Sequence, residues 1–143
     1  MDHTVQVAIV TAAASIVVAV VSFVLNKRAQ RQDAIQDRKL AHYEKLLSAI
    51  SDLAVDGTDK EEANQQFAHT VNTIALVAPQ HVISALMDFH DEVRFTNPNR
   101  TNEGSQHKLR TLLLEMRKSI NLPFKDNPET FNFHLVGSRP PKS

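Results

Sequence analysis

The N-terminal part of the chain contains one long apolar run. Residues 5–25 are twenty-one residues without a charge, a glycine or a proline. As a helix, this run rises about 31 Å at ~1.5 Å per residue, which is the thickness of the hydrocarbon core of a bilayer. The pattern predicts one transmembrane helix within an anchor segment, residues 1–26.

Three other structures compete with a spanning helix. A cleaved signal peptide carries positive charge before its apolar stretch, whereas only Asp2 and His3 precede this one. An interfacial amphipathic helix needs a charged face, which the run lacks. A core helix of a soluble domain usually turns one polar stripe toward water. We therefore favour the spanning helix.

Helical periodicity continues beyond the anchor. The first glycine is Gly57 and the first proline is Pro79, so no residue before them must break a helix. Apolar positions recur at the 3-and-4 spacing of one helical face: Ile35, Leu40, Tyr43, Leu46, Leu47, Ile50, Leu53 and Ala54. The anchor is expected to run directly into a juxtamembrane stalk helix over residues 27–55.

Residues 56–123 predict the remaining helices of a cytoplasmic bundle. The first of these follows a turn at residues 56–59 and reaches about Val77. Either Thr58 or Asp59 has the spacing of a capping box, in which a side chain accepts from a free backbone N–H of the first turn.

Two more helices follow in the same segment. Pro79 cannot continue a helix and is expected in the first turn of the next one, which runs from Gln80 to about Phe95. Ser105 is the predicted cap of the last helix, which reaches about Ile120 after a polar loop.

The C-terminal residues 124–143 form a tail with a different pattern. Phe131, Phe133 and Leu135 alternate at period two, which predicts an extended segment across the bundle or a lone edge strand. The expected fold class is therefore all-α: an N-terminal transmembrane helix, a cytoplasmic bundle of about four helices, and an extended C-terminal tail.

Charge sets the expected orientation. Cationic residues next to a span stay in the cytoplasm, so the basic group after the anchor predicts a cytoplasmic C-terminal domain and an outside N-terminus. Lys27, Arg28 and Arg31 of that group are expected to contact anionic lipid headgroups, at ~1 kcal/mol per residue. The absence of cysteine agrees with a reducing compartment.

Total charge is balanced, with sixteen basic and sixteen acidic residues, so the chain as a whole has no field that would recruit nucleic acid. The expected partners are the lipid bilayer, further copies of the chain and a cytoplasmic protein.

Small and hydroxyl side chains form one stripe on the anchor. Positions that advance by ~100° each place eight of them within an arc of roughly 100°. They are Thr4, Ala8, Thr11, Ala12, Ser15, Ala19, Ser22 and Asn26. Such stripes let membrane helices approach closely, so the pattern predicts self-association, or a narrow polar pore in a larger assembly. The alternative is that the hydroxyls only bond to carbonyls one turn earlier in their own helix.

One short motif has the spacing of a catalytic pair. Arg100 and His107 bracket six residues, and this pattern resembles the signature of HEPN ribonucleases, which implies that Arg holds an RNA phosphate and His moves a proton. Thr101 and the pair Gly104–Ser105 depart from that signature. About one such match is expected by chance in a chain of this composition, so the alternative is an exposed arginine and histidine.

Other chemistry is not expected. His81, Asp88, His90, Asp91 and Glu92 are close in sequence, but their spacing on a helix gives no set of three ligands, so we predict a solvated face and no metal or other cofactor. The sequence also has no nucleophile triad pattern, no glycine-rich phosphate loop and no CxxC element.

The overall plan resembles that of small bacterial inner-membrane proteins of unassigned function. The resemblance lies in the N-terminal span, in Tyr43 followed by paired leucines, and in the closing "LLxxMR" stretch from Leu112 to Arg117. In outline, one anchor plus a HEPN-like bundle is also similar to the membrane accessory protein of RNA-targeting CRISPR systems. That likeness implies assembly into a pore and a role in phage defence.

Three functions follow from these patterns. We favour a non-enzymatic, self-associating membrane protein that acts through interaction or membrane perturbation. The second is a membrane-tethered ribonuclease that uses Arg100 and His107. The third is a scaffold that brings a cytoplasmic partner to the membrane through the tail.

Overall fold

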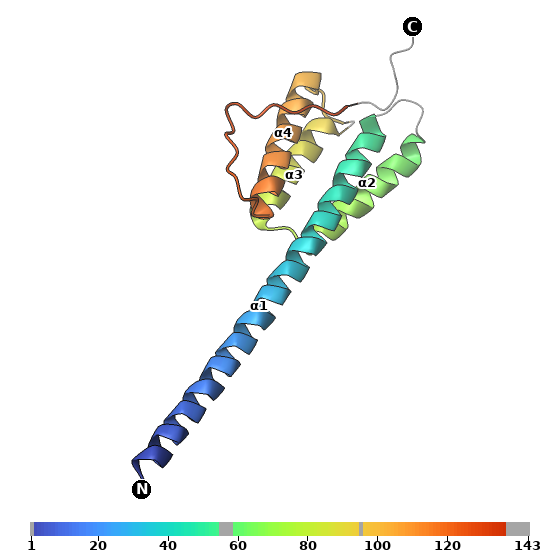
Figure 1. Ribbon diagram of the computed structural model, residues 1–143. Helices are drawn as coiled ribbons and strands as arrows, with labels where there is room; N and C mark the ends of the chain where they lie inside the picture. Colours follow the sequence, from blue (N-terminus) through green and yellow to red (C-terminus); the bar gives the residue numbers. More distant parts are fainter. Residues whose placement is uncertain (1, 55–58, 95, 137–143) are drawn as a thin grey trace. The chain divides into compact units, whose positions relative to one another are not determined.

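The computed structural model describes residues 2–54, 59–94 and 96–136 (Figure 1). In these ranges the protein is all-α, without a strand. The four helices are α1 (His3–Ala54), α2 (Lys60–Ile74), α3 (Gln80–Val93) and α4 (Asn102–Ser119). The predicted fold class is thereby confirmed at this level. The chain forms two compact units, Met1–Asp37 and Arg38–Ser143.

Helix α1 has 52 residues and passes through both units. The expectation that the apolar run continues directly into the stalk is confirmed. The helix can continue over this length because residues 3–54 contain no glycine or proline that would weaken or break it.

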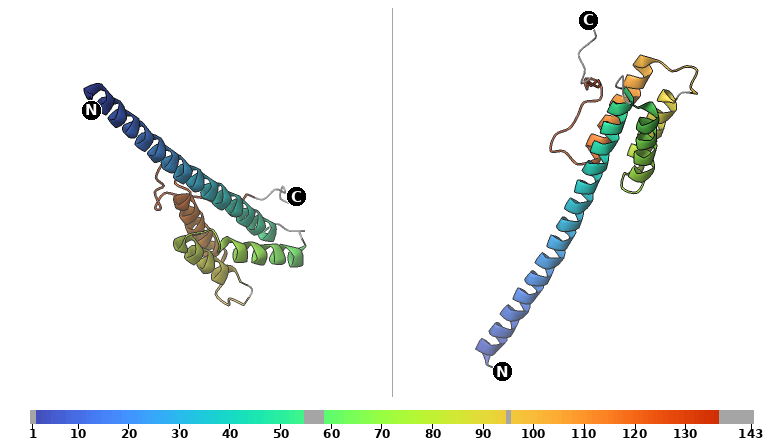
Figure 2. Two further views of the ribbon diagram at one scale, coloured as in Figure 1. Left: turned by 90° about the horizontal axis from the view of Figure 1, so that it is seen from below. Right: turned by 90° about the vertical axis from the view of Figure 1, so that its right-hand side faces the viewer.

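The second unit has one hydrophobic core. The C-terminal part of α1 and helices α2, α3 and α4 each contribute buried side chains to it. Its members are Tyr43, Leu46, Ala49, Ile50, Phe67, Ile74, Val82, Ala85, Leu86, Phe89, Leu109, Leu112 and Met116. Helices α3 and α4 lie side by side, as Figures 1 and 2 both show. The apolar face that the 3-and-4 spacing gives to each helix thus packs into one shared core.

A polar contact joins α1 to the end of α4 inside this unit. The hydroxyls of Tyr43 and Ser119 lie 2.5 Å apart, and Lys39 Nζ donates to the Ser119 carbonyl at 3.0 Å. Burial raises the pKa of Tyr43, while the hydrogen bond with Ser119 opposes that shift. Both buried hydroxyls therefore have a partner, and Lys39 satisfies one of the carbonyls that a helix end leaves free.

The caps of α2 and α3 refine the predicted boundaries. Asp59 is the N-cap of α2 and accepts from the backbone N–H groups of Glu61 and Glu62, whereas Thr58 lies outside the described residues. This helix ends at Ile74, three residues earlier than predicted, and a turn follows. Pro79 is the N-cap of α3 and not part of its first turn, because its ψ of 159° is extended.

The start of α4 was predicted wrongly. The cap is Thr101, whose Oγ1 accepts from the Gly104 N–H at 3.0 Å, and Ser105 is already inside the helix. Gly104 permits this arrangement, because a Cβ there would collide with Glu92 Oε1 and Thr101 Oγ1. A glycine and a serine looked like a helix boundary in the sequence, but both lie inside the first turns of α4, where Glu92 and Thr101 approach the glycine closely.

The described part of the tail contains a turn at residues 128–130 and no strand. Residues 131–136 alternate between half-buried and exposed, and Phe133 and Leu135 pack against the core. The period-two pattern therefore marks a short segment that packs on the core, whereas the prediction of one extended tail does not hold at the turn. The predicted end of the last helix holds, since α4 stops at Ser119 and Asn121 adopts a left-handed φ of 52°.

Two neighbouring side chains on α3 test the position of this core. Leu86 is 0% exposed and Met87 is 38% exposed. We expect Leu86→Ala to lower the free energy of unfolding by about 2–5 kcal/mol, because it leaves a cavity, and Met87→Ala to lower it by under about 1 kcal/mol. Urea unfolding in mild detergent, followed by circular dichroism, measures both. Equal losses for the two variants would contradict this assignment of the core.

Candidate functional site

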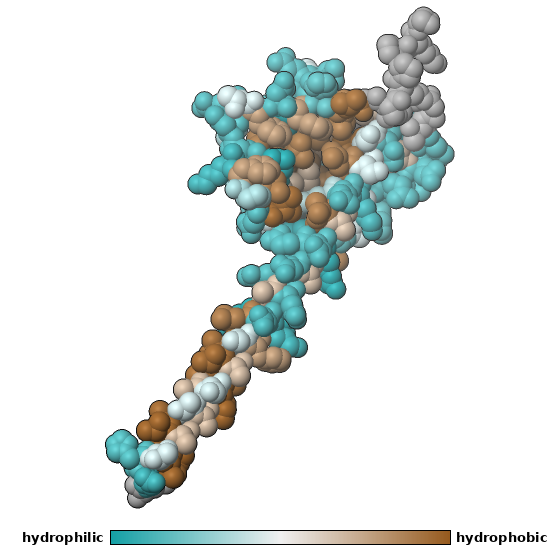
Figure 3. Space-filling model, in the orientation of Figure 1, coloured by the Kyte–Doolittle hydropathy of each residue, from teal (hydrophilic) through white to brown (hydrophobic). Residues whose placement is uncertain are grey.

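The largest unusual surface belongs to the N-terminal part of α1. The most apolar eighteen-residue window of this helix is 0% buried within the protein, and it meets the length and composition of a membrane span. Figure 3 shows the apolar colouring along this segment. Its exposed large side chains are Val5, Val7, Ile9, Val10, Ile16, Val17, Val18, Val20, Val21, Phe23, Val24 and Leu25. The protein has one candidate transmembrane helix in the residues that the structure describes.

The exposure of this surface argues against a core helix of a soluble domain. Such a helix would be mostly covered by its own protein, whereas this window is 0% buried. Moving a large apolar side chain out of water is worth ~1.5–3 kcal/mol, so the exposed parts of these twelve represent on the order of 10–20 kcal/mol. That exceeds the typical net stability of a small domain.

The small-residue stripe lies on the uncovered segment, and all eight of its residues are exposed. Two of its hydroxyls donate within their own helix: Thr11 Oγ1 to the Val7 carbonyl at 2.8 Å, and Ser15 Oγ to the Thr11 carbonyl at 3.0 Å. The alternative explanation of the stripe, in which hydroxyls bond to carbonyls one turn earlier in their own helix, therefore applies to Thr11 and Ser15. What the stripe still offers a neighbouring helix is low side-chain volume and spare acceptor lone pairs.

The basic flank follows immediately. Lys27, Arg28 and Arg31 are exposed, and none of them has an ion pair with another described residue. The Lys27 ammonium lies 5.4 Å from the centre of the Phe23 ring, the last aromatic residue of the apolar run. The flank can therefore offer three cationic groups to anions at the membrane surface.

The structure does not pair the two residues of the ribonuclease motif. Arg100 Nη1 donates to the Val93 carbonyl at 3.2 Å. His107 is exposed on α4, and no hydrogen bond or ion pair connects these two described residues. Because the catalytic signature is proposed to work across two chains, the ribonuclease hypothesis stays a prediction.

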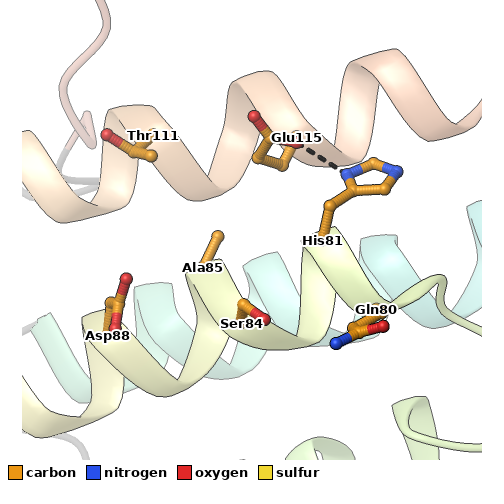
Figure 4. Close-up of a pocket in the computed structure, with 7 residues that line it drawn as sticks. All are labelled: Gln80, His81, Ser84, Ala85, Asp88, Thr111 and Glu115. Carbon is orange, nitrogen blue, oxygen red and sulfur yellow. Dashed lines mark hydrogen bonds and ion pairs between the residues drawn. The ribbon is translucent and has the colours of Figure 1, made fainter.

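A shallow pocket lies between α3 and α4 (Figure 4). His81 Nδ1 and Glu115 Oε2 lie 2.6 Å apart across it, and the His81 side chain is 43% exposed. This contact ties the first turn of α3 to α4. Among the residues that the structure describes, no group of three or more His, Cys, Asp or Glu side chains is arranged to hold a metal ion.

A second, deeper cavity lies between α4 and the tail, and we call it the α4–tail groove. It has a volume of about 570 Å³. Its lining residues are His107, Arg110, Thr111, Leu114, Glu115, Arg117, Lys118, Asn121, Leu122, Phe124, Lys125, Asp126, Pro128 and Phe131. The tail turns back after α4 and runs beside it (Figure 1), and its residues from Phe124 to Phe131 contribute the second wall of the groove.

One ion pair holds that wall in place. Arg117 donates to both carboxylate oxygens of Asp126, at 2.8 and 3.0 Å, and its guanidinium lies 5.4 Å from the Phe124 ring centre and 5.7 Å from that of Phe131. The hydrogen bonds from Arg117 lower the pKa of Asp126 and raise the pKa of Arg117. A planar guanidinium suits both contacts, because it binds carboxylates with two donors and stacks on aromatic rings.

Comparison with protein-family models, with curated proteins and with solved structures gives no match for this chain. The site residues therefore have to be interpreted from their own geometry.

Sequence reasoning missed the contacts that shape both cavities. Arg117 and Asp126 are nine residues apart with a helix end between them, and His81 and Glu115 are thirty-four apart. Neither spacing corresponds to a helical or strand period. One signal for the Arg117–Asp126 contact was present in the sequence, namely the excess of charged and aromatic residues at 117–131. The prediction for the last helix considered only its apolar residues.

The Arg117–Asp126 pair predicts a pH dependence of tail docking. A carboxyl whose pKa is lowered by folding stabilises the folded state above its ordinary value of 3.8 and loses this effect as the pH falls below that value. We expect Asp126→Asn to remove the dependence and to speed hydrogen exchange at the Phe131 amide several-fold at pH 7. Asp52→Asn, at an exposed position of α1, is the control. Unchanged exchange in the Asp126 variant would refute the docking role.

Proposed function

We propose that this protein is a single-span protein of a bacterial inner membrane, with its N-terminus outside and its helical domain in the cytoplasm. The observation that supports the proposal is the uncovered apolar surface on residues 5–25. The basic flank that follows supports the orientation. A signal sequence would give a similar apolar helix, so the proposal depends on retention of this segment in the mature protein.

We further propose that copies associate through the small-residue stripe. In lipid, helices gain little from the hydrophobic effect, and close packing of small side chains becomes the main attraction. The self-bonded hydroxyls of Thr11 and Ser15 favour association by shape over association by hydrogen bonds between chains. The biological role would be interaction or membrane perturbation by the assembly, for which phage defence is an analogy based on resemblance alone.

Membrane retention is the first test. We expect the intact full-length chain to sediment with membranes at high speed and to resist alkaline carbonate extraction, because residues 5–25 remain in lipid. Protease added outside spheroplasts should leave the C-terminal domain intact. Recovery of a shortened chain that lacks residues 1–26, or of the full chain in the supernatant, would overturn the proposed anchor.

Association is tested by bulky substitutions on two faces of the same helix. Ala12→Leu, Ser15→Leu and Ala19→Leu together should reduce cross-linked oligomers about tenfold in mild detergent, because the added volume separates the helices. Ala13→Leu, Val17→Leu and Val20→Leu together form the matched control on the opposite face. An oligomer distribution that responds equally to both triple variants would contradict the stripe as the interface.

A further inference from the structure

The α4–tail groove carries positive charge that the protein does not neutralise. Its two carboxylates are already engaged, Asp126 by Arg117 and Glu115 by His81 and Lys118. Arg110 and Lys125 have no hydrogen-bond or ion-pair partner among the residues described. An anion that enters the groove would therefore meet two cationic side chains without displacing an existing carboxylate.

The same groove has an apolar part. Phe124 is 57% exposed although it lines the groove, and Leu114, Leu122 and Phe131 are half-buried beside it. The guanidinium carbon of Arg117 lies 5.4 Å from the centre of the Phe124 ring, and more than half of this side chain is exposed. An accessible aromatic ring is a common stacking platform for planar groups.

Size and charge narrow the possible occupants. A volume of about 570 Å³ is within the range of small-molecule sites, roughly 300–1,000 Å³. The favoured ligand is thus small, anionic and partly planar.

We propose that the α4–tail groove binds a nucleoside phosphate, with the phosphates at Arg110 and Lys125 and the base against Phe124. Such a ligand has an anionic part and a planar part, and the groove offers cationic side chains and an accessible ring. This site lies wholly within the second unit, so the proposal does not depend on membrane insertion or self-association.

The test uses the full-length protein in uncharged detergent micelles, with calorimetric titration of ATP, inorganic triphosphate and adenosine. We expect saturable binding of ATP with one site per chain, and weaker binding of both fragments. Arg110→Ala with Lys125→Ala should weaken ATP binding about tenfold or more, because two charged donors are lost. The matched control, Arg94→Ala with Lys45→Ala, removes the same residue types outside the groove and should change binding less than about twofold.

A second variant separates the base from the phosphates. Phe124→Ala should weaken ATP binding about fivefold or more and leave triphosphate binding unchanged, because the stacking surface is lost while Arg110 and Lys125 remain. The proposal is overturned if ATP does not bind saturably, or if triphosphate binds as tightly as ATP. It is also overturned if the Arg110/Lys125 variant binds like the control, or if poly-glutamate competes as well as ATP.

Discussion

Removal of one apolar helix surface from water is the constraint on which the rest of this protein depends. Twelve large aliphatic or aromatic side chains on the first half of α1 have no cover from their own chain. Water is a poor solvent for so large a surface, and soluble monomers rarely expose apolar patches of this size. A stripe of small residues lies on the same segment of the helix, and a basic flank follows it directly.

In the second unit the same helix is partly buried instead of exposed. There α1 turns one face into a core shared with three short helices, and its polar side chains reach the end of α4. Short helices are marginal alone, so α2, α3 and α4 depend on this shared burial for their stability. The long helix thus provides both the uncovered surface and part of the packed one.

Much of this fold could be predicted from the periodicity of apolar residues, and the predictions that failed have physical causes. The long helix and the three that follow it came from apolar spacing and from the positions of glycine and proline. The start of α4 was missed because a cap depends on local geometry around Thr101, which composition does not reveal. The groove was missed because Arg117 and Asp126 meet only after the chain turns back at Asn121. The residues that such a turn brings together cannot be identified from the spacing of apolar positions along the sequence.

The crowded position of Gly104 has an evolutionary consequence. A Cβ there would clash with Glu92 Oε1, at the far end of a flexible side chain, and would lie 2.8 Å from Thr101 Oγ1. A threonine cap is compatible with a side chain three residues later, so Glu92 is the residue that has to give way. A side chain at position 104 should consequently be inherited together with a change at position 92, while the cap at Thr101 is kept.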